Sequence, residues 1–89
     1  MDLKDLDAVM REHRLRGVTL NVYIVLLSQL DDLDWRPLKR EHLARLLARR
    51  RASITDALTD LVNRGLLERR PAVDDPRARL YRLVYEKRT

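Results

Sequence analysis

Residues 38–85 are LKREHLARLLARRRASITDALTDLVNRGLLERRPAVDDPRARLYRLVY, and this stretch decides the fold. Its first half has apolar residues at helical spacing in two runs, residues 38–47 and 54–62. The apolar faces consist of Leu43, Ala44, Leu46 and Leu47 in the first run and of Ile54, Leu58, Leu61 and Val62 in the second. Gly65 follows the second run, where glycine commonly ends a helix in the left-handed conformation. Two helices this short and this close together bury such faces by crossing each other, which predicts a helix-turn-helix.

The second half of the stretch predicts a pair of β-strands. Leu66-Leu67 and residues 80–85 suit strands, whereas residues 71–78 between them contain too much Pro and Asp to be strand. Helix, turn, helix, strand, loop and strand occur in this order in a winged helix-turn-helix. We therefore predict an α+β domain that is mainly helical and carries a small antiparallel β-hairpin, the wing.

Two further helices are expected before this stretch. Asp2 is placed to cap the first, which ends in basic residues before Gly17. The apolar residues at helical spacing in the first helix are Leu3, Leu6, Val9 and Met10. Thr19 is placed to cap the second helix, which is apolar on nearly all sides and should form the centre of the core. Trp35 is expected to be a core or edge-strand residue.

The 89 residues are expected to form one winged helix-turn-helix domain, residues 1–89. Its parts are an N-terminal helix (1–16), a core helix (18–31), the helix-turn-helix (38–63) and the wing hairpin (66–85). A domain of this size has a marginal core, which is often supplemented by oligomerisation.

Basic residues concentrate in the second part of the chain. Residues 36–89 contain 15 Lys and Arg against 7 Asp and Glu, a net charge of +8, whereas residues 1–35 carry a net charge of −3. Sixteen of the 19 basic residues are Arg, whose planar guanidinium suits bidentate contact to phosphate or guanine. A one-sided basic surface attracts the phosphate backbone of nucleic acid. The alternative is a solvated surface in an Arg-rich proteome, which would not gather arginines at the turn and the loop.

The sequence offers no catalytic constellation. Cys is absent, which excludes disulfides and thiolate metal sites. His13 and His42 are expected on different helices, and Asp31, Asp32 and Asp34 lack the spacing of a calcium loop. Two isolated glycines cannot make a Gly-rich phosphate loop. We therefore predict that the protein is not an enzyme and has no catalytic residues, no metal and no cofactor.

The candidate DNA-binding residues lie at the turn, on the second helix of the pair and on the hairpin. Arg49, Arg50 and Arg51 are expected in the turn and at the helix start, the end that enters the major groove. Opposite the apolar face of that helix lie Ser53, Thr55, Asp56 and Thr59. Asp56 would repel phosphates unless it accepts from a cytosine amino group, orients a neighbouring Arg or points away. The basic residues on or beside the hairpin are Arg69, Arg70, Arg77, Arg79 and Arg82.

Several segments resemble the MarR family of winged helix-turn-helix transcriptional regulators. Residues 38–47 resemble the first helix of the family's motif, and residues 48–61 resemble its turn and recognition helix. The segment NRGLLERRP, residues 63–71, is very similar to the family's Gly-Leu strand entry, and DDPRA, residues 74–78, is similar to its acidic-then-Arg wing. The resemblance covers about residues 18–85 and implies a DNA-binding transcriptional repressor. It also implies Arg77 as the residue that enters the minor groove, with Asp75 as its orienting partner.

The sequence departs from the family pattern at the turn and at the C-terminus. Ala48 stands where the turn usually has Gly, and Arg50 takes the place of the usual Ser cap. Because the sequence stops at Thr89, the C-terminal helices that pair MarR-like subunits are expected to be missing. A homodimer on a palindromic site is still expected, since one recognition helix contacts only a few base pairs. The apolar stripe of the first helix either pairs two subunits or folds back as core.

Two other functions remain open on this sequence. Residues 27–35 also look like the winged helices of plasmid and phage replication initiators, so the chain is alternatively the DNA-binding module of such a replication or maintenance protein. The other alternative is a winged helix used only for protein–protein contact. Residues 18–30 are too short and too polar to cross a bilayer, and no signal peptide precedes them. We expect a soluble, cytoplasmic, nucleoid-associated protein whose partner is double-stranded DNA and not a membrane.

Overall fold

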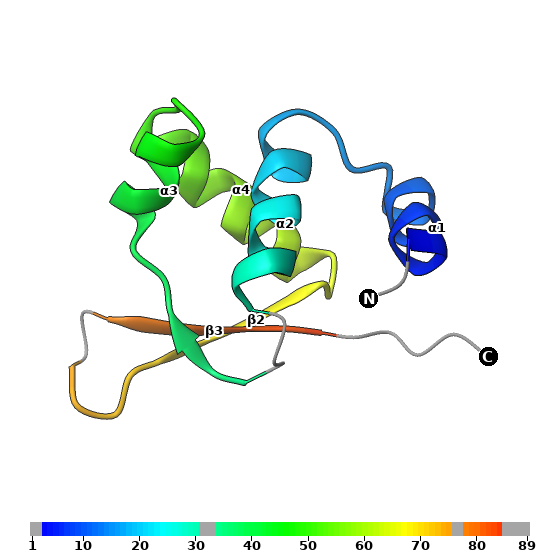
Figure 1. Ribbon diagram of the computed structural model, residues 1–89. Helices are drawn as coiled ribbons and strands as arrows, with labels where there is room; N and C mark the ends of the chain where they lie inside the picture. Colours follow the sequence, from blue (N-terminus) through cyan, green and yellow to red (C-terminus); the bar gives the residue numbers. More distant parts are fainter. Residues whose placement is uncertain (1–2, 31–33, 76–77, 85–89) are drawn as a thin grey trace.

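Three helices stand on one face of a small antiparallel sheet, and a fourth helix lies to one side of them (Figure 1). The computed structural model describes residues 3–30, 34–75 and 78–84, with side chains from residue 7 onward. The elements are α1 (Leu3–His13), α2 (Gly17–Gln29), β1 (Arg36–Pro37), α3 (Arg40–Leu46), α4 (Arg51–Asn63), β2 (Leu67–Pro71) and β3 (Arg79–Leu83). The predicted α+β winged helix-turn-helix is confirmed. No helix of these described segments is long and apolar enough to cross a membrane.

The sheet has three strands in the order β1–β3–β2, not the two that the sequence predicts. β2 and β3 form the predicted hairpin, in which Arg69 pairs with Tyr81 and Pro71 with Arg79. The prediction that Pro71 lies outside the strand is wrong by one residue, because Pro71 ends β2, which lies at an edge of the sheet. The additional strand β1 pairs only two residues with β3, which is too short a run to leave a period-2 pattern in the sequence. Trp35, expected in the core or in an edge strand, is half-buried and lies one residue before this edge strand, so the expectation is wrong by one residue.

Side chains of the hairpin alternate between the two faces of the sheet. Leu67, Tyr81 and Leu83 are buried beneath the helices. Arg69 and Arg79 lie on this same face, because each is two residues from one of those buried side chains. Arg70 and Arg82 therefore lie on the outer face. The register thus divides the hairpin arginines into two groups.

α2 lies at the centre of the core, as its apolar composition predicts. Val22, Tyr23 and Leu26 of this helix are fully buried. They pack against a cluster to which α4 contributes Ile54, Ala57, Leu58 and Leu61, and the sheet contributes Leu67, Tyr81 and Leu83. Val9 of α1 also belongs to this buried cluster. At that position, therefore, the apolar stripe of the first helix packs into the core of its own chain.

Two predicted helix ends are wrong. α1 ends at His13 and not at Arg16, because Arg14 adopts a left-handed conformation (φ 51°) and the Leu15 amide donates to the Met10 carbonyl. Thr19 does not cap α2, which already begins at Gly17. The predicted Asp2 cap lies outside the described residues.

The helix-turn-helix follows the prediction with one exception in its apolar faces. Leu43 is buried, and Ala44 and Leu47 pack against the core, but Leu46 is 55% exposed because α3 is a short helix with one face on the core. Ala48 takes the left-handed conformation (φ 52°) at the end of α3, where the Arg49 amide donates to the Ala44 carbonyl. The same arrangement ends α4 at Gly65 (φ 76°), which confirms the predicted glycine stop.

Candidate nucleic-acid interface

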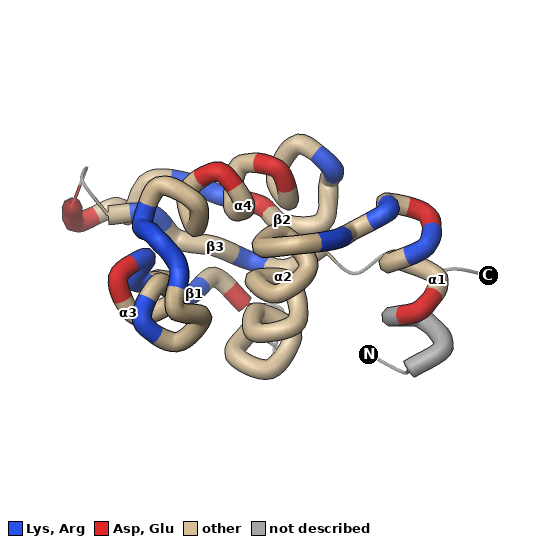
Figure 2. Tube along the Cα trace, turned by 90° about the horizontal axis from the view of Figure 1, so that it is seen from above, with Lys and Arg blue, Asp and Glu red and all other residues tan. Residues whose placement is uncertain are grey.

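The turn between α3 and α4 presents three consecutive arginines to solvent. Arg49, Arg50 and Arg51 are all exposed and form a continuous basic segment between the two helices (Figure 2). Arg50 occupies the N-cap position of α4, and its side chain makes no capping hydrogen bond. The amide groups of the first turn of α4 therefore lack a side-chain acceptor there, and they add positive potential to that of the arginines.

Arg51, the first residue of α4, is held by an acid from α3. Its Nη1 atom lies 3.4 Å from Oε1 of Glu41, and the two side chains are 61% and 67% exposed. An ion pair this exposed contributes little to stability. It does, however, fix the direction of Arg51 and place a carboxylate beside the start of the helix.

Thr55 lies one turn further along α4, on the same flank as Arg51. Its hydroxyl donates to the Arg51 carbonyl at 3.1 Å. The same oxygen accepts from Nη1 of Arg40, the first residue of α3, at 3.4 Å. Arg40 thus ties the start of α3 to the first turns of α4.

The other flank of α4 is acidic and faces α2. Ser53 and Asp56 line a shallow hollow there, together with Asp60 and Thr19. The Thr19 hydroxyl donates to Asp60 at 3.1 Å, and Arg64 pairs with Asp60 at 2.9 Å. Asp56 is exposed on this acidic flank, whereas Thr59, also on α4, is half-buried.

The two faces of the hairpin place its arginines in different surroundings. Arg69 and Arg79, on the helix-facing side, line a pocket with Arg40 and Tyr81. On the outer face, the guanidinium carbons of Arg70 and Arg82 lie 4.2 and 4.6 Å from the centre of the Trp35 ring. Arg82 also pairs with Glu68 at 3.0 Å.

The predicted site residues therefore separate into three regions. In the first region, Arg51, Thr55, Arg69 and Arg79 are brought together through Arg40, and Arg49 and Arg50 directly precede α4. In the second, Ser53 and Asp56 lie toward α2, and Thr59 is half-buried further along α4. In the third, Arg70 lies on the outer face of the sheet. Arg77 lies outside the described residues. So do Asp31 and Asp32, and the segments that are described hold no cluster of three His, Cys, Asp or Glu able to bind a metal.

The chain shares its fold with a repressor of known structure, although no match is found by sequence comparison. No protein-family model matches the chain, and neither does any curated protein sequence. The crystal structure of the adhesin competence repressor AdcR from Streptococcus pyogenes aligns over 92% of this chain with a TM-score of 0.58 and 24% identity. AdcR is a winged-helix regulator of the MarR family. This chain has the same winged-helix fold.

The winged helix corresponds to only part of the repressor, since the alignment spans 57% of the AdcR chain. At this level of identity the similarity establishes the fold alone, which is the winged helix-turn-helix expected from the sequence. Three residues of the winged helix were missed at the candidate site: Arg40, Glu41 and Tyr81. The alternation of side chains along β3 would have placed Tyr81 on the same face of the sheet as Arg79. Nothing in the sequence indicates that Arg40, at the start of α3, also lies next to these two residues.

Proposed function

We propose that this winged helix binds double-stranded DNA in a sequence-specific manner and regulates transcription. The observation that carries the proposal is the exposed run Arg49, Arg50 and Arg51 at an uncapped helix start. Cations at the positive end of a helix dipole cost stability, each by about 0.3–1 kcal/mol. A phosphate backbone at this position would reverse that cost, because it supplies the negative charge that both the arginines and the helix end attract.

The start of α4 is the part of the proposed interface that enters the major groove. We assign base recognition to Arg51, Ser53 and Thr55, with Asp56 and Thr59 further along the helix, and backbone contact to Arg49 and Arg50. The exposure of Arg51 and the position of Thr55 on its flank support this assignment. Arg51→Ala should cost about 1–3 kcal/mol on the preferred site and relax its sequence preference, whereas Arg50→Ala should weaken all sequences about equally.

The hairpin supplies the second part of the interface. Arg69 and Arg79 lie on the side of α4 and would contact the backbone, while Arg70 adds positive charge from the outer face. We assign Arg77 to the adjacent minor groove. Arg77→Ala should therefore lose most affinity on sites with A·T-rich flanks, where the narrow groove concentrates negative potential. Equal losses on A·T and G·C flanks would make Arg77 an ordinary phosphate contact.

Specific binding by a domain with one short recognition helix favours a homodimer on a two-fold symmetric site. Val9 is buried within the chain, so α1 offers a pairing surface only through residues other than Val9. Sedimentation with and without a palindromic duplex tests the proposal. A DNA-binding regulator would act in the cytoplasm, in association with the nucleoid.

The test of DNA binding is selection from a random duplex library, followed by titration of the selected and a scrambled duplex. Arg51→Ala should abolish the preference for the selected duplex. Arg11→Ala is the matched control, because Arg11 is 80% exposed on α1 and pairs with Asp7 of the same helix, not with a residue at the start of α4. A library that yields no enriched sequence, or a control that loses as much preference as Arg51→Ala, would refute the proposal. Enrichment of a repeated, origin-like array would instead indicate the replication-initiator alternative.

A further inference from the structure

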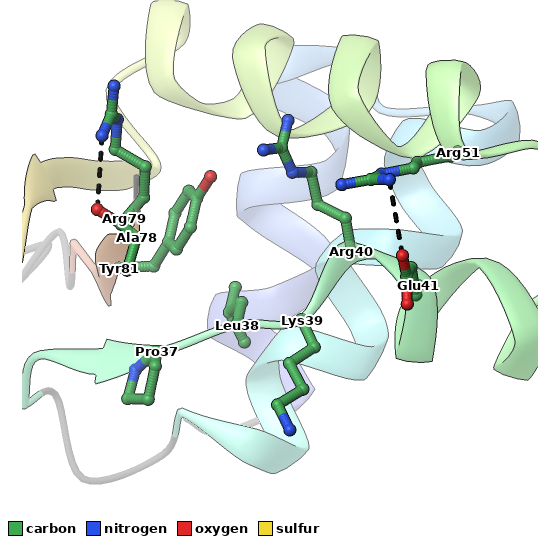
Figure 3. Close-up of a pocket in the computed structure, with 9 residues that line it drawn as sticks. All are labelled: Pro37, Leu38, Lys39, Arg40, Glu41, Arg51, Ala78, Arg79 and Tyr81. Atoms are coloured by element: carbon green, nitrogen blue, oxygen red, sulfur yellow. Dashed lines mark hydrogen bonds and ion pairs between the residues drawn. The ribbon is translucent and has the colours of Figure 1, made fainter. Parts of the chain in front are cut away.

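The pocket between the start of α3 and the sheet is lined by three arginines and one buried tyrosine. Arg40, Arg69, Arg79 and Tyr81 enclose an open space of about 310 Å³. Figure 3 shows Tyr81 between Arg79 and Arg40, with its hydroxyl on the side to which both guanidinium groups extend. Arg69 is the strand partner of Tyr81 in β2. Elements far apart in the sequence thus direct basic groups to one place.

The charge of this pocket is not balanced by the residues that line it, none of which is acidic. Elsewhere, Arg11, Arg51, Arg64 and Arg82 each pair with a carboxylate. Arg40 and Arg69 make no ion pair with any residue of the described segments. Like charges held together repel each other, so an anion in the pocket would stabilise this arrangement.

Tyr81 adds an independent indication of a ligand. Its side chain is only 3% exposed, and within the described part of the chain its hydroxyl makes no hydrogen bond. The hydroxyl oxygen itself is not enclosed by protein, since it is not among the fully buried polar atoms that lack a partner, so it is accessible to a ligand. Tyr81 lines the pocket, and its hydroxyl lies on the same side as the Arg40 and Arg79 guanidinium groups, where it can donate to a bound oxygen atom (Figure 3).

We propose that this pocket binds one phosphate group of the DNA backbone, an inference that rests on the function proposed above. Guanidinium groups and a hydroxyl are the donors that a phosphate oxygen accepts from, and charge-assisted hydrogen bonds of this kind are the strong ones. The pocket adjoins a groove lined by Arg40, Glu41, Arg51 and Tyr81, so it opens directly beside the start of α4. A duplex that meets the start of α4 passes this opening.

The bound phosphate positions the duplex against two elements at once. Arg40 contacts Thr55 of α4, and Arg69 and Arg79 belong to the hairpin. A phosphate held by all three arginines fixes the distance between the recognition helix and the wing on the DNA. The contact is independent of base sequence, since every nucleotide carries the same phosphate.

Two variants remove the proposed contact in different ways. Arg40→Gln keeps a hydrogen-bond donor for Thr55 but removes the charge, and it should weaken selected and scrambled duplexes alike, on the order of 10-fold. The salt slope of log affinity should shrink by about 0.9, the share of one phosphate. Tyr81→Phe removes only the hydroxyl and should weaken binding about 2- to 10-fold. Arg11→Gln, which removes the same charge from α1, should change affinity by less than about 2-fold.

The decisive measurement replaces each backbone phosphate of the selected duplex, one at a time, by an uncharged methylphosphonate. One position should lose affinity with the unaltered protein and lose little more with Arg40→Gln, because both changes remove the same contact. The scan on the unaltered protein and on Tyr81→Phe still tests the proposal if Arg40→Gln fails to fold. Additive losses at every phosphate would overturn it.

A titration of the protein with inorganic phosphate separates a free ion from the backbone. Binding of inorganic phosphate that Arg40→Gln abolishes, with DNA affinity unchanged in that variant, would identify a free-anion site and overturn the proposal. Salt-dependent DNA binding that Arg40→Gln leaves unaltered in both affinity and slope would refute this pocket while the proposed function stands. Absence of salt-dependent DNA binding in the unaltered protein would refute the proposed function itself.

Discussion

Arg51 and Glu41 form an ion pair of 3.4 Å between the first residue of α4 and the first turn of α3. In the proposed complex this pair has two opposite effects. It holds the Arg51 side chain in one direction, which favours a specific contact, and it places a carboxylate where phosphates would approach. The balance between these effects is measurable, because both partners are exposed and a change at Glu41 should leave the fold intact.

Glu41→Gln should tighten DNA binding. The change releases Arg51 from an exposed ion pair, worth about 0.2–1 kcal/mol, and removes a negative charge from the interface, so we expect affinity to rise about 1.5- to 5-fold. Glu68→Gln is the control, since Glu68 pairs with Arg82 on the hairpin. Fluorescence anisotropy on one duplex compares the two. Weaker binding by Glu41→Gln than by Glu68→Gln would show that Glu41 assists Arg51 rather than competing with DNA.

Ala48→Gly should stabilise the protein by up to about 1 kcal/mol. Ala48 has a φ of 52°, a conformation that costs an L-residue roughly 1–2 kcal/mol but costs glycine nothing. Glycine also makes the unfolded chain more flexible, which offsets part of the stabilisation. Ala52→Gly, in the helical part of α4, should destabilise the protein instead. Urea unfolding of both variants measures the difference. Equal destabilisation by the two substitutions would contradict the left-handed turn at Ala48.

Trp35 should report separately on the two faces of the hairpin. It is the only tryptophan, and the Arg70 guanidinium lies 4.2 Å from the centre of its ring. Arg70→Gln should therefore shift the tryptophan emission and cost about 0.5–1 kcal/mol of stability. Arg69→Gln, on the opposite face, should leave the emission unchanged and weaken DNA binding. An emission change with Arg69→Gln but not with Arg70→Gln would contradict the assigned strand register.

Arg64→Met should destabilise the contact between α1 and α4. Arg64 donates to the backbone carbonyl of His13 and pairs with Asp60 at 2.9 Å, so its loss removes both contacts and leaves Asp60 only the hydrogen bond from Thr19. We expect the free energy of unfolding to fall by about 1–2 kcal/mol. Hydrogen bonds to charged groups contribute more to stability than neutral ones, but exposure of about one-third of the site reduces this contribution. Arg11→Met removes an exposed pair with Asp7 and should cost less than about 0.5 kcal/mol. Thermal unfolding that ranks the two variants in the reverse order would be incompatible with this account.

The sequence predicts those parts of the fold in which a residue type has one strong preference. Gly65 marks the end of α4 because glycine is the residue best suited to the left-handed conformation, and the apolar run of α2 can only be central. Arg14 and Ala48 adopt the same left-handed conformation, but neither residue type requires it. Their helix ends are set by hydrogen bonds and packing, which leave no mark in the local sequence. The strand β1 was missed for a similar reason, since only its pairing with β3 makes it a strand.

The candidate site shows the same division. Arg49, Arg50 and Arg51 are consecutive, so their location in the turn and at the start of α4 follows directly from the helical pattern on either side. The pocket residue Arg40 cannot be found in this way, because the packing of α3 against the hairpin brings it to Arg69 and Tyr81. The acidic flank of α4, with Asp56 and Asp60, likewise becomes evident only when α2 is in place.

The most direct test of the central claim is the salt dependence of duplex binding between about 50 and 200 mM monovalent salt. If about 5–8 phosphates are contacted per pair of subunits, log affinity should fall linearly with log salt concentration at a slope of about −4 to −7. The Lys and Arg residues behind the net charge of +8 in residues 36–89 would neutralise these phosphates and displace the cations condensed on the DNA. Affinity that is unchanged across this range, or no binding to duplex DNA at its lowest salt concentration, would contradict the account.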